Sequence, residues 1–118
     1  MALLLLAGCG EKPQLISSDK PFEYWLTAVK DGDAQVRKKA VFNLGLIGTK
    51  HEGAVPALIR AVTDPEPKVR GTAILALLKI GPDARAAIPA LTAARNDEDE
   101  KNRMYAAKAL ERIQGKSP

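Results

Sequence analysis

One spacing recurs along this chain and restricts its fold more than any other feature. Aspartate, arginine, alanine and leucine each return three times at intervals of 33 residues, and no insertion interrupts the register. The recurring residues are Asp31, Asp64 and Asp97; Arg37, Arg70 and Arg103; Ala40, Ala73 and Ala106; and Leu44, Leu77 and Leu110. An ungapped period of this length is typical of an array of stacked helix pairs, in which each pair buries its apolar face against its neighbours.

Apolar periodicity predicts where the longer helix of each pair lies. In the second unit Val69, Ala73, Leu77 and Ile80 fall on one face of a helix. Pro67 is placed in the first turn of this helix, where its missing N–H costs nothing. Gly81 can adopt the left-handed conformation that closes a helix; Gly48 stands at the equivalent place in the first unit, and Gly115 is near it in the third. The same face in the first unit, which we expect to be core, consists of Val36, Ala40, Leu44 and Ile47.

A shorter helix is expected before each long one, over about residues 21–30, 54–63 and 84–96. The 118 residues suffice for one domain. Aromatic residues make up only 4% of the chain, so Leu, Ile, Val and Ala must form the core. We therefore predict an all-α fold, a right-handed α-solenoid of three helix pairs that occupy about residues 21–53, 54–86 and 87–118.

The second unit carries a family motif. Pro56-Ala57-Leu58, Asp64, Val69-Arg70, Ala73 and Gly81 resemble the HEAT repeat, especially the short bacterial form that also occurs in phycobilin lyases. The resemblance extends over about residues 21–114, with Glu23 in place of the proline in the first unit and Asn102 in place of valine in the third. This motif is specific for a fold and unspecific for a function.

The HEAT resemblance implies that the repeated aspartates and arginines form a polar ladder between neighbouring units. The six residues are Asp31, Arg37, Asp64, Arg70, Asp97 and Arg103. A physical argument agrees, because each arginine lies beside the apolar face of its helix and a half-buried guanidinium needs a carboxylate partner. We interpret these residues as structural.

The first 20 residues predict a subcellular location. Leu6-Ala7-Gly8-Cys9 resembles the lipobox of bacterial lipoproteins, which implies a lipid on Cys9, a shortened signal over residues 1–8 and a polar tether over residues 9–20. The expected location is the cell envelope, with the protein lipid-anchored and facing the periplasm or the exterior. No Lys or Arg precedes the leucines, as an export signal would have. The alternative is a cytoplasmic protein whose apolar N-terminus packs on the first helix.

Residue types argue against catalysis and against a resident cofactor. The chain has one histidine, His51, and one cysteine, so a metal site is not expected. HEAT-like hydroxylases bind iron through several His-Glu pairs, and His51-Glu52 is a single pair. We therefore expect no catalytic residue, no metal and no cofactor, and we rank a lyase-like or hydroxylase-like accessory role lowest. A net charge of +4 is too small to indicate nucleic-acid binding, and no small-molecule substrate is expected.

The side of the long helices opposite their core face is the candidate binding surface. The candidate residues are Lys38, Lys39, Phe42, Leu46, Thr72, Leu75, Lys79, Met104, Tyr105, Lys108 and Arg112. Gly71 and Leu78 are expected on the same side. Apolar residues edged by Lys and Arg would suit an amphipathic or acidic peptide, which predicts a non-catalytic protein-binding scaffold or adaptor. Two alternatives stay open: the tail or a neighbouring helix covers the apolar residues, or the domain associates with itself or with a larger HEAT protein.

Overall fold

The protein is a short stack of three antiparallel helix pairs. A computed structural model describes residues 20–115, and within that range every regular element is helical. The elements are α2 (Phe22–Ala28), α3 (Ala34–Ile47), the 3-10 turn η2 (Gly48–Lys50), α4 (Ala54–Ala61), α5 (Pro67–Ile80), the 3-10 segment η3 (Gly81–Ala87), α6 (Ile88–Ala94) and α7 (Glu100–Gln114). We call α2 with α3 unit one, α4 with α5 unit two, and α6 with α7 unit three. The prediction of an all-α solenoid is confirmed, whereas the signal, Cys9 and residues 9–19 of the tether lie outside the described residues.

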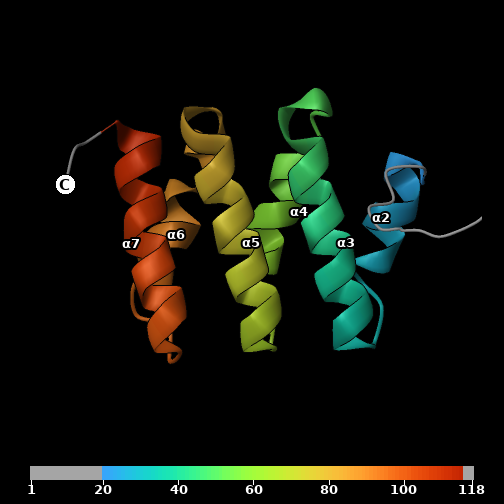
Figure 1. Cartoon of the computed structure of the whole chain (residues 1–118), viewed down its shortest axis with the longest axis horizontal. Coiled ribbons are helices and arrows are strands. Elements are labelled where there is room, and N and C mark those ends of the chain that lie inside the picture. Colours follow the sequence, from blue (N-terminus) through green and yellow to red (C-terminus); the bar gives the residue numbers. More distant parts are fainter. Residues whose placement is uncertain (1–19, 116–118) are drawn as a thin grey trace, which may run out of the picture.

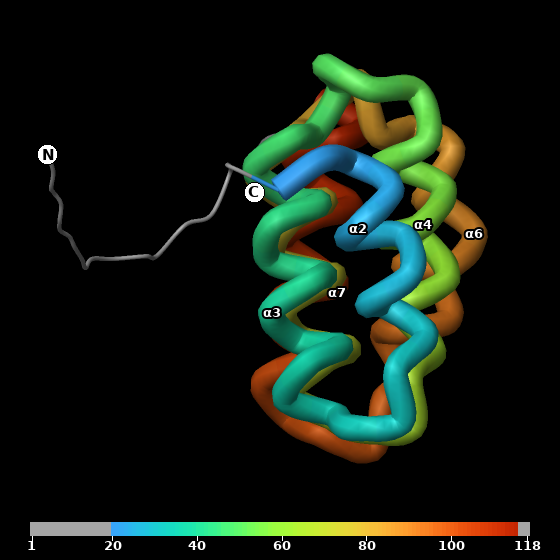
Figure 2. Tube along the Cα trace, turned by 90° about the vertical axis from the view of Figure 1, so that its right-hand side faces the viewer, coloured from blue at the N-terminus to red at the C-terminus, as the bar shows by residue number. Residues whose placement is uncertain are grey.

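The helices form two layers with the core between them. The long helices α3, α5 and α7 lie side by side in one layer, and the short helices α2, α4 and α6 form the other (Figure 1; Figure 2). Trp25, Leu58 and Leu91 fill equivalent buried places in the three short helices. Leu44, Leu77 and Leu110 of the long helices belong to the same hydrophobic core. One 33-residue period therefore corresponds to one helix pair, which adds one helix to each layer.

One predicted core residue is exposed. Val36 is 37% exposed, whereas Val69 at the same register in unit two is 1% exposed. A valine at this place is covered by the preceding unit, and among the described residues no unit precedes unit one. The stripe of apolar residues was thus identified correctly, but its first member lies at an end of the stack.

The third short helix starts later than predicted. Ala84, expected to begin it, belongs to η3 with φ −101° and ψ 30°, and α6 starts at Ile88. Pro89 explains the difference, because a helix from Ala84 would place the proline ring against the carbonyl of Arg85 in a helix interior. At the start of α6 the same proline loses no hydrogen bond. The other two short helices end about two residues earlier than expected.

Glycine closes all three long helices, in two conformations. Gly115 is left-handed as predicted, with φ 74° and ψ 19°. Gly48 and Gly81 also have positive φ, 54° and 76°, but their ψ angles are −135° and −142°, so the left-handed prediction is wrong for these two. This combination is nearly restricted to glycine and lets the chain leave the helix directly into a 3-10 turn.

Candidate functional site

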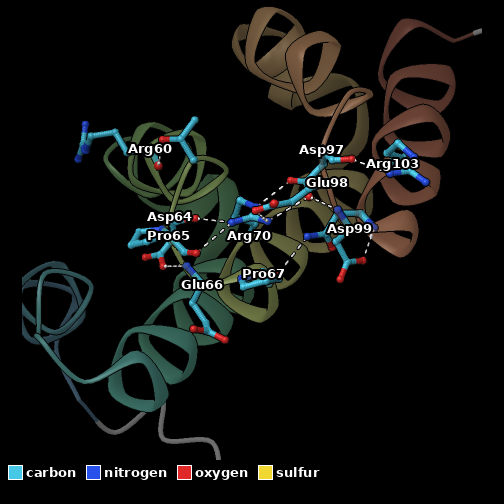
Figure 3. A network of polar contacts seen from close by, with 12 residues as sticks. Arg60, Asp64, Pro65, Glu66, Pro67, Arg70, Asp97, Glu98, Asp99 and Arg103 are labelled. Carbon is cyan, nitrogen blue, oxygen red and sulfur yellow. Dashed lines mark hydrogen bonds and ion pairs between the residues drawn. The ribbon is translucent and has the colours of Figure 1, made fainter.

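The repeated arginines and aspartates join adjacent units as a ladder. Arg37 Nε and Nη2 donate to the two carboxylate oxygens of Asp64 at 2.8 and 3.1 Å. Arg70 makes the same bidentate contact with Asp97 at 2.7 and 3.1 Å (Figure 3). In both cases the carboxylate belongs to the next unit along the stack. A planar fork facing a carboxylate in this way fixes orientation as well as distance.

Each ladder arginine also holds the loop of its own unit. Arg70 Nη1 donates to the carbonyl oxygens of Asp64 and Pro65 at 2.9 and 3.2 Å. Arg37 does the same with Asp31 and Gly32 at 2.9 and 3.0 Å. The guanidinium thus satisfies polar backbone groups of one loop while it binds the carboxylate of the next, which is a structural role.

The Arg70–Asp97 pair of the ladder shifts the pKa values of both partners. The hydrogen bond to Asp97 is the largest influence on Arg70 and raises the pKa of the guanidinium. Burial opposes ionisation of Asp97, but hydrogen bonds from Arg70 and from the Asp99 backbone N–H outweigh it and lower the pKa of Asp97. Arg37 likewise has a raised pKa, chiefly because of its hydrogen bond to Asp64. These three groups are therefore held in their charged forms.

The ladder is incomplete at both ends of the described stack. Asp31 accepts a hydrogen bond from the backbone N–H of Asp33 at 2.9 Å, and no arginine among residues 20–115 contacts it. Arg103 Nη1 donates to the carbonyl oxygen of Asp97 at 2.8 Å, but within the same residues no carboxylate pairs with Arg103. Of the six predicted ladder residues, four form carboxylate pairs and two occupy the ends.

A groove between α3 and α5 collects most of the predicted binding residues. Phe42 and Leu46 are 48% and 50% exposed, large fractions for apolar side chains of this size. Together with Gly45, Thr72, Leu75, Ala76 and Lys79 they line a cavity of about 170 Å³. An adjoining, more open hollow is lined by Gln35, Lys38, Lys39, Phe42 and Thr72. We call these two together the α3–α5 groove.

The charge of the α3–α5 groove has one sign. Its ionisable lining residues are Lys38, Lys39 and Lys79, and no carboxylate from residues 20–115 lines either cavity. Lys39 and Lys79 are exposed at the rim, while Leu75 is half-buried. A strip of exposed apolar side chains edged by lysines is suited to an apolar side chain that is followed by an acidic one.

Gly45 determines how closely the walls of the groove approach each other. A Cβ atom added at Gly45 would lie 2.8 Å from the Cβ of Ala76, closer than two carbon atoms can pack. The absence of a side chain therefore brings α3 and α5 together at this point. Sequence reasoning missed Gly45, Ala76 and Gln35, although a glycine inside a predicted helix is a signal of close packing.

A second hollow lies between α5 and α7 but has mixed charge. It encloses about 490 Å³, and its lining includes Lys68, Lys101, Asp99, Glu100 and Tyr105. Asn102 Nδ2 donates to the carbonyl oxygen of Pro67 at 3.0 Å across this interface. A Cβ atom added at Gly71 would lie 2.6 Å from Asn102 Oδ1, so the buried Asn102 fits only because Gly71 has no side chain. Neighbouring opposite charges make this hollow less selective for a charged partner.

The remaining predicted face residues are dispersed. Met104, Lys108 and Arg112 are exposed on α7 but line neither the α3–α5 groove nor the α5–α7 hollow. Arg112 Nε lies 3.1 Å from the position a Cβ on Gly81 would occupy, so its side chain reaches the end of α5. Gly71 is buried, and Leu78 is half-buried against the core. Those two predicted members of the face are packing residues.

His51 has a packing role in the loop after α3. Its ring stacks on Phe22 with centroids 3.5 Å apart and an interplanar angle of 15°. Its Nδ1 accepts a hydrogen bond from the backbone N–H of Gly53 at 3.1 Å. Within residues 20–115 no three His, Cys, Asp or Glu side chains come together as a metal site would require. None of the helices in that range has both the length and the apolar composition needed to cross a bilayer.

The repeat motif and the fold agree with one protein family. The family model described as HEAT repeats matches residues 22–111, and the chain therefore belongs to the HEAT-repeat family. Proteins of this family generally mediate protein–protein interaction and are typically non-catalytic scaffolds. The comparison with curated proteins gives no match.

A solved structure supports the same fold. The chain is similar to an engineered protein whose crystal structure superposes with a TM-score of 0.62 at 22% sequence identity. The similarity covers 80% of this chain and 45% of the engineered protein, so the chain spans less than half the length of that relative. At this identity the likeness concerns the helical architecture alone.

Proposed function

We propose that the protein is a non-catalytic adaptor whose α3–α5 groove binds an amphipathic, acidic helical segment of a partner protein. The observation that carries the proposal is the pair of exposed residues Phe42 and Leu46 beside lysines in a groove without carboxylates. Exposed apolar groups lose contact with water when a partner covers them. The lysines would favour acidic flanking residues and would reject basic ones.

The shape of the groove suits a helix better than an extended strand. Both walls are helices whose backbone hydrogen bonds are made within each helix, so no open sheet edge is offered to a partner strand. A partner helix could place apolar residues at i, i+3 or i+4 and i+7 along Phe42, Leu46 and Leu75. Acidic residues on either side of that stripe would then meet Lys39 and Lys79.

A peptide selection tests this proposal. A displayed library of helical peptides is selected on the full-length chain, and the best peptide is titrated against Lys39→Glu/Lys79→Glu, Phe42→Ala and Arg112→Glu. We expect apolar residues at helical spacing with flanking Asp or Glu. We also expect about a five- to thirtyfold loss of affinity for the first two variants, since two reversed charges or a lost ring each remove roughly 1–2 kcal/mol.

Arg112→Glu is the matched control, because it reverses a charge on the same layer but outside the groove. It should retain the affinity of the natural chain within about a factor of three, since a distant surface charge contributes little. Equal binding by all variants, or selected peptides without acidic residues, would contradict the groove as the binding site.

We further propose that the adaptor is lipid-anchored through Cys9 at the cell envelope. The support is the Leu6-Ala7-Gly8-Cys9 sequence followed by a polar segment. Eleven residues from Gly10 to Lys20 can span at most about 40 Å, enough to keep the helical stack clear of the lipid headgroups. In a bacterial host we expect the natural chain to partition into detergent and Cys9→Ala to stay in the aqueous phase. Identical partitioning of the two would favour the cytoplasmic alternative.

A further inference from the structure

The contacts between units identify three register positions that face the preceding unit. Asp64 and Asp97 accept the arginine of the preceding long helix. Asn102 donates to Pro67 of the preceding long helix. Ala76 packs against Gly45 of the preceding long helix. These contacts define what a unit presents to the unit before it.

In unit one the same three positions lie at one end of the described stack. They are occupied by Asp31, Val36 and Asn43, each 33 residues before its equivalent in unit two. Asp31 is exposed and lacks an arginine partner among the described residues, and Val36 is far more exposed than Val69. Asn43 is buried, and its Nδ2 donates to the Lys39 carbonyl oxygen at 2.9 Å, but its Oδ1 has no partner within residues 20–115. We call the two exposed residues, Asp31 and Val36, the leading face.

The opposite end of the stack carries the residues that would meet the leading face. Positions that face the following unit are Arg37 and Arg70 in the ladder, Gly71 against Asn102, and Gly45 against Ala76. In unit three the equivalent residues are Arg103, Met104 and Glu111. Arg103 and Met104 are exposed, and Glu111 is half-buried. We call Arg103, Met104 and Glu111 the trailing face.

We propose that a second copy of this chain docks with its leading face on the trailing face of the first, and so continues the stack. Arg103 of one copy would pair with Asp31 of the next, as Arg37 pairs with Asp64 within the chain. Met104 would lie against Val36, which matches two exposed apolar side chains. Asn43 is buried within its own chain, so the contact between copies depends on these two pairs.

The short helices limit the strength of this contact. Ile59 and Val62 of unit two are replaced in unit three by Thr92 and Arg95, so the short helix beside the trailing face is less apolar than its equivalent in unit two. Recognition therefore depends on the Arg103–Asp31 pair more than on buried apolar area. Such a contact is weak and sensitive to salt. Because the two faces differ, the contact is heterologous and copies can add repeatedly.

Charge exchange between the two faces tests the proposal. The full-length chain is studied by sedimentation equilibrium under reducing conditions, from about 10 μM to about 1 mM, the range in which weak association is populated. We expect the weight-average mass to rise above the 12.6 kDa of one chain and to fall when salt is added. Asp31→Arg alone and Arg103→Asp alone should each remain at the mass of one chain, because like charges then meet.

Mixing the two variants supplies the decisive observation. An equimolar mixture of Asp31→Arg and Arg103→Asp restores opposite charges at every contact, and the double variant does so in one chain, so both should regain the higher mass. Asp83→Arg and Arg85→Asp are matched controls, since they change exposed charges on η3 away from both faces. They should associate like the natural chain.

Three results would overturn the proposal. The natural chain could stay at the mass of one chain throughout. The occupant of the leading face would then be residues 1–19 or a different protein. Association could survive both single exchanges, as it would if the apolar residues 1–9 caused it. The mixture and the double variant could also fail to regain mass although both single variants keep the natural helical circular dichroism.

Discussion

At the scale of single residues, the units are joined by polar or charged side chains that are both buried and hydrogen-bonded. Arg70 is buried, and its donors reach Asp97, Asp64 and Pro65. Asn102 is buried as well, and its amide is satisfied by Pro67. Buried polar groups cost little when each finds a partner and much when a partner is removed. The units are therefore joined by groups that tolerate few substitutions.

Asp97→Asn tests the Arg70–Asp97 pair of the ladder. The folded pKa of Asp97 is below its value of about 3.9 in an unfolded chain, so its contribution is present above about pH 4 and is lost as the pH falls through the folded pKa. We expect the variant to lose about 1–3 kcal/mol of unfolding free energy at pH 7. The loss should shrink toward pH 2, as measured by urea denaturation across that range.

Asp31→Asn is the matched control, because Asp31 has the same register without an arginine among the described residues. In dilute protein it should cost less than about 1 kcal/mol, the worth of one exposed hydrogen bond. Equal losses for the two variants, or a loss for Asp97→Asn that does not depend on pH, would show that the ladder pair adds nothing.

At the scale of elements, the spacing between helices depends on residues that the repeat does not keep constant. Gly45 has Leu78 and Glu111 at its register, and Gly71 has Lys38 and Met104 at its own. Each glycine lies where a neighbouring long helix approaches closely. The 33-residue period predicts which face of each helix is inward. The two glycines, which the repeat does not keep, determine how closely neighbouring helices approach. The α3–α5 groove exists because of one of them.

Gly45→Leu would copy the residue found at the same register in unit two. Helix propensity alone favours leucine by roughly 1 kcal/mol, yet the added side chain must displace Ala76, so we expect a net loss of about 1–3 kcal/mol. Peptide binding to the groove should fall in parallel because its walls separate. Gly32→Ala is the control, since a Cβ at Gly32 meets nothing within 4 Å and should leave thermal unfolding nearly unchanged. A stabilised Gly45→Leu variant would contradict the close-approach argument.

At the scale of the whole molecule, the three units within residues 20–115 form one stack, and among them only unit two has a neighbour on both sides (Figure 1). Arg37 and Arg70 both take their carboxylates from the following unit, so the ladder makes each unit depend on the next. The stability of such arrays is approximately the sum of the intrinsic stability of each unit and of the interfaces between neighbours. The end units therefore expose faces that the middle unit buries.

Removal of unit three tests this dependence. A chain that ends at Gly81 leaves Ile74, Leu77 and Arg70 uncovered, and about three units are needed for a stable array. We expect its helical circular dichroism to fall by well over the one third of the helices removed. A chain that ends at Gly115 keeps every described helix and should match the natural signal. Proportional loss after truncation at Gly81 would mean that the units fold independently.

The sequence by itself determined the number of helix pairs, their order and the residues that tie them. It could do so because a helix face repeats every 3.6 residues and a stacked unit repeats its contacts. Asp64, Asp97, Arg37 and Arg70 were identified as ladder residues from their period together with the resemblance to the HEAT repeat. Positions such as Val36, Gly71 and Leu78 were misassigned, since the same register is core, interface or surface according to which unit lies beside it.

Only the tertiary structure decided which partner each group meets. Periodicity placed each arginine near a loop with an aspartate, but the folded chain shows that the carboxylate comes from the next unit and the carbonyl oxygens from its own. It also brought Phe42, Leu46 and Leu75 together around one groove between α3 and α5, where Gly45 and Ala76 touch. These outcomes depend on distances between helices, and those distances follow from side-chain volumes packed in three dimensions.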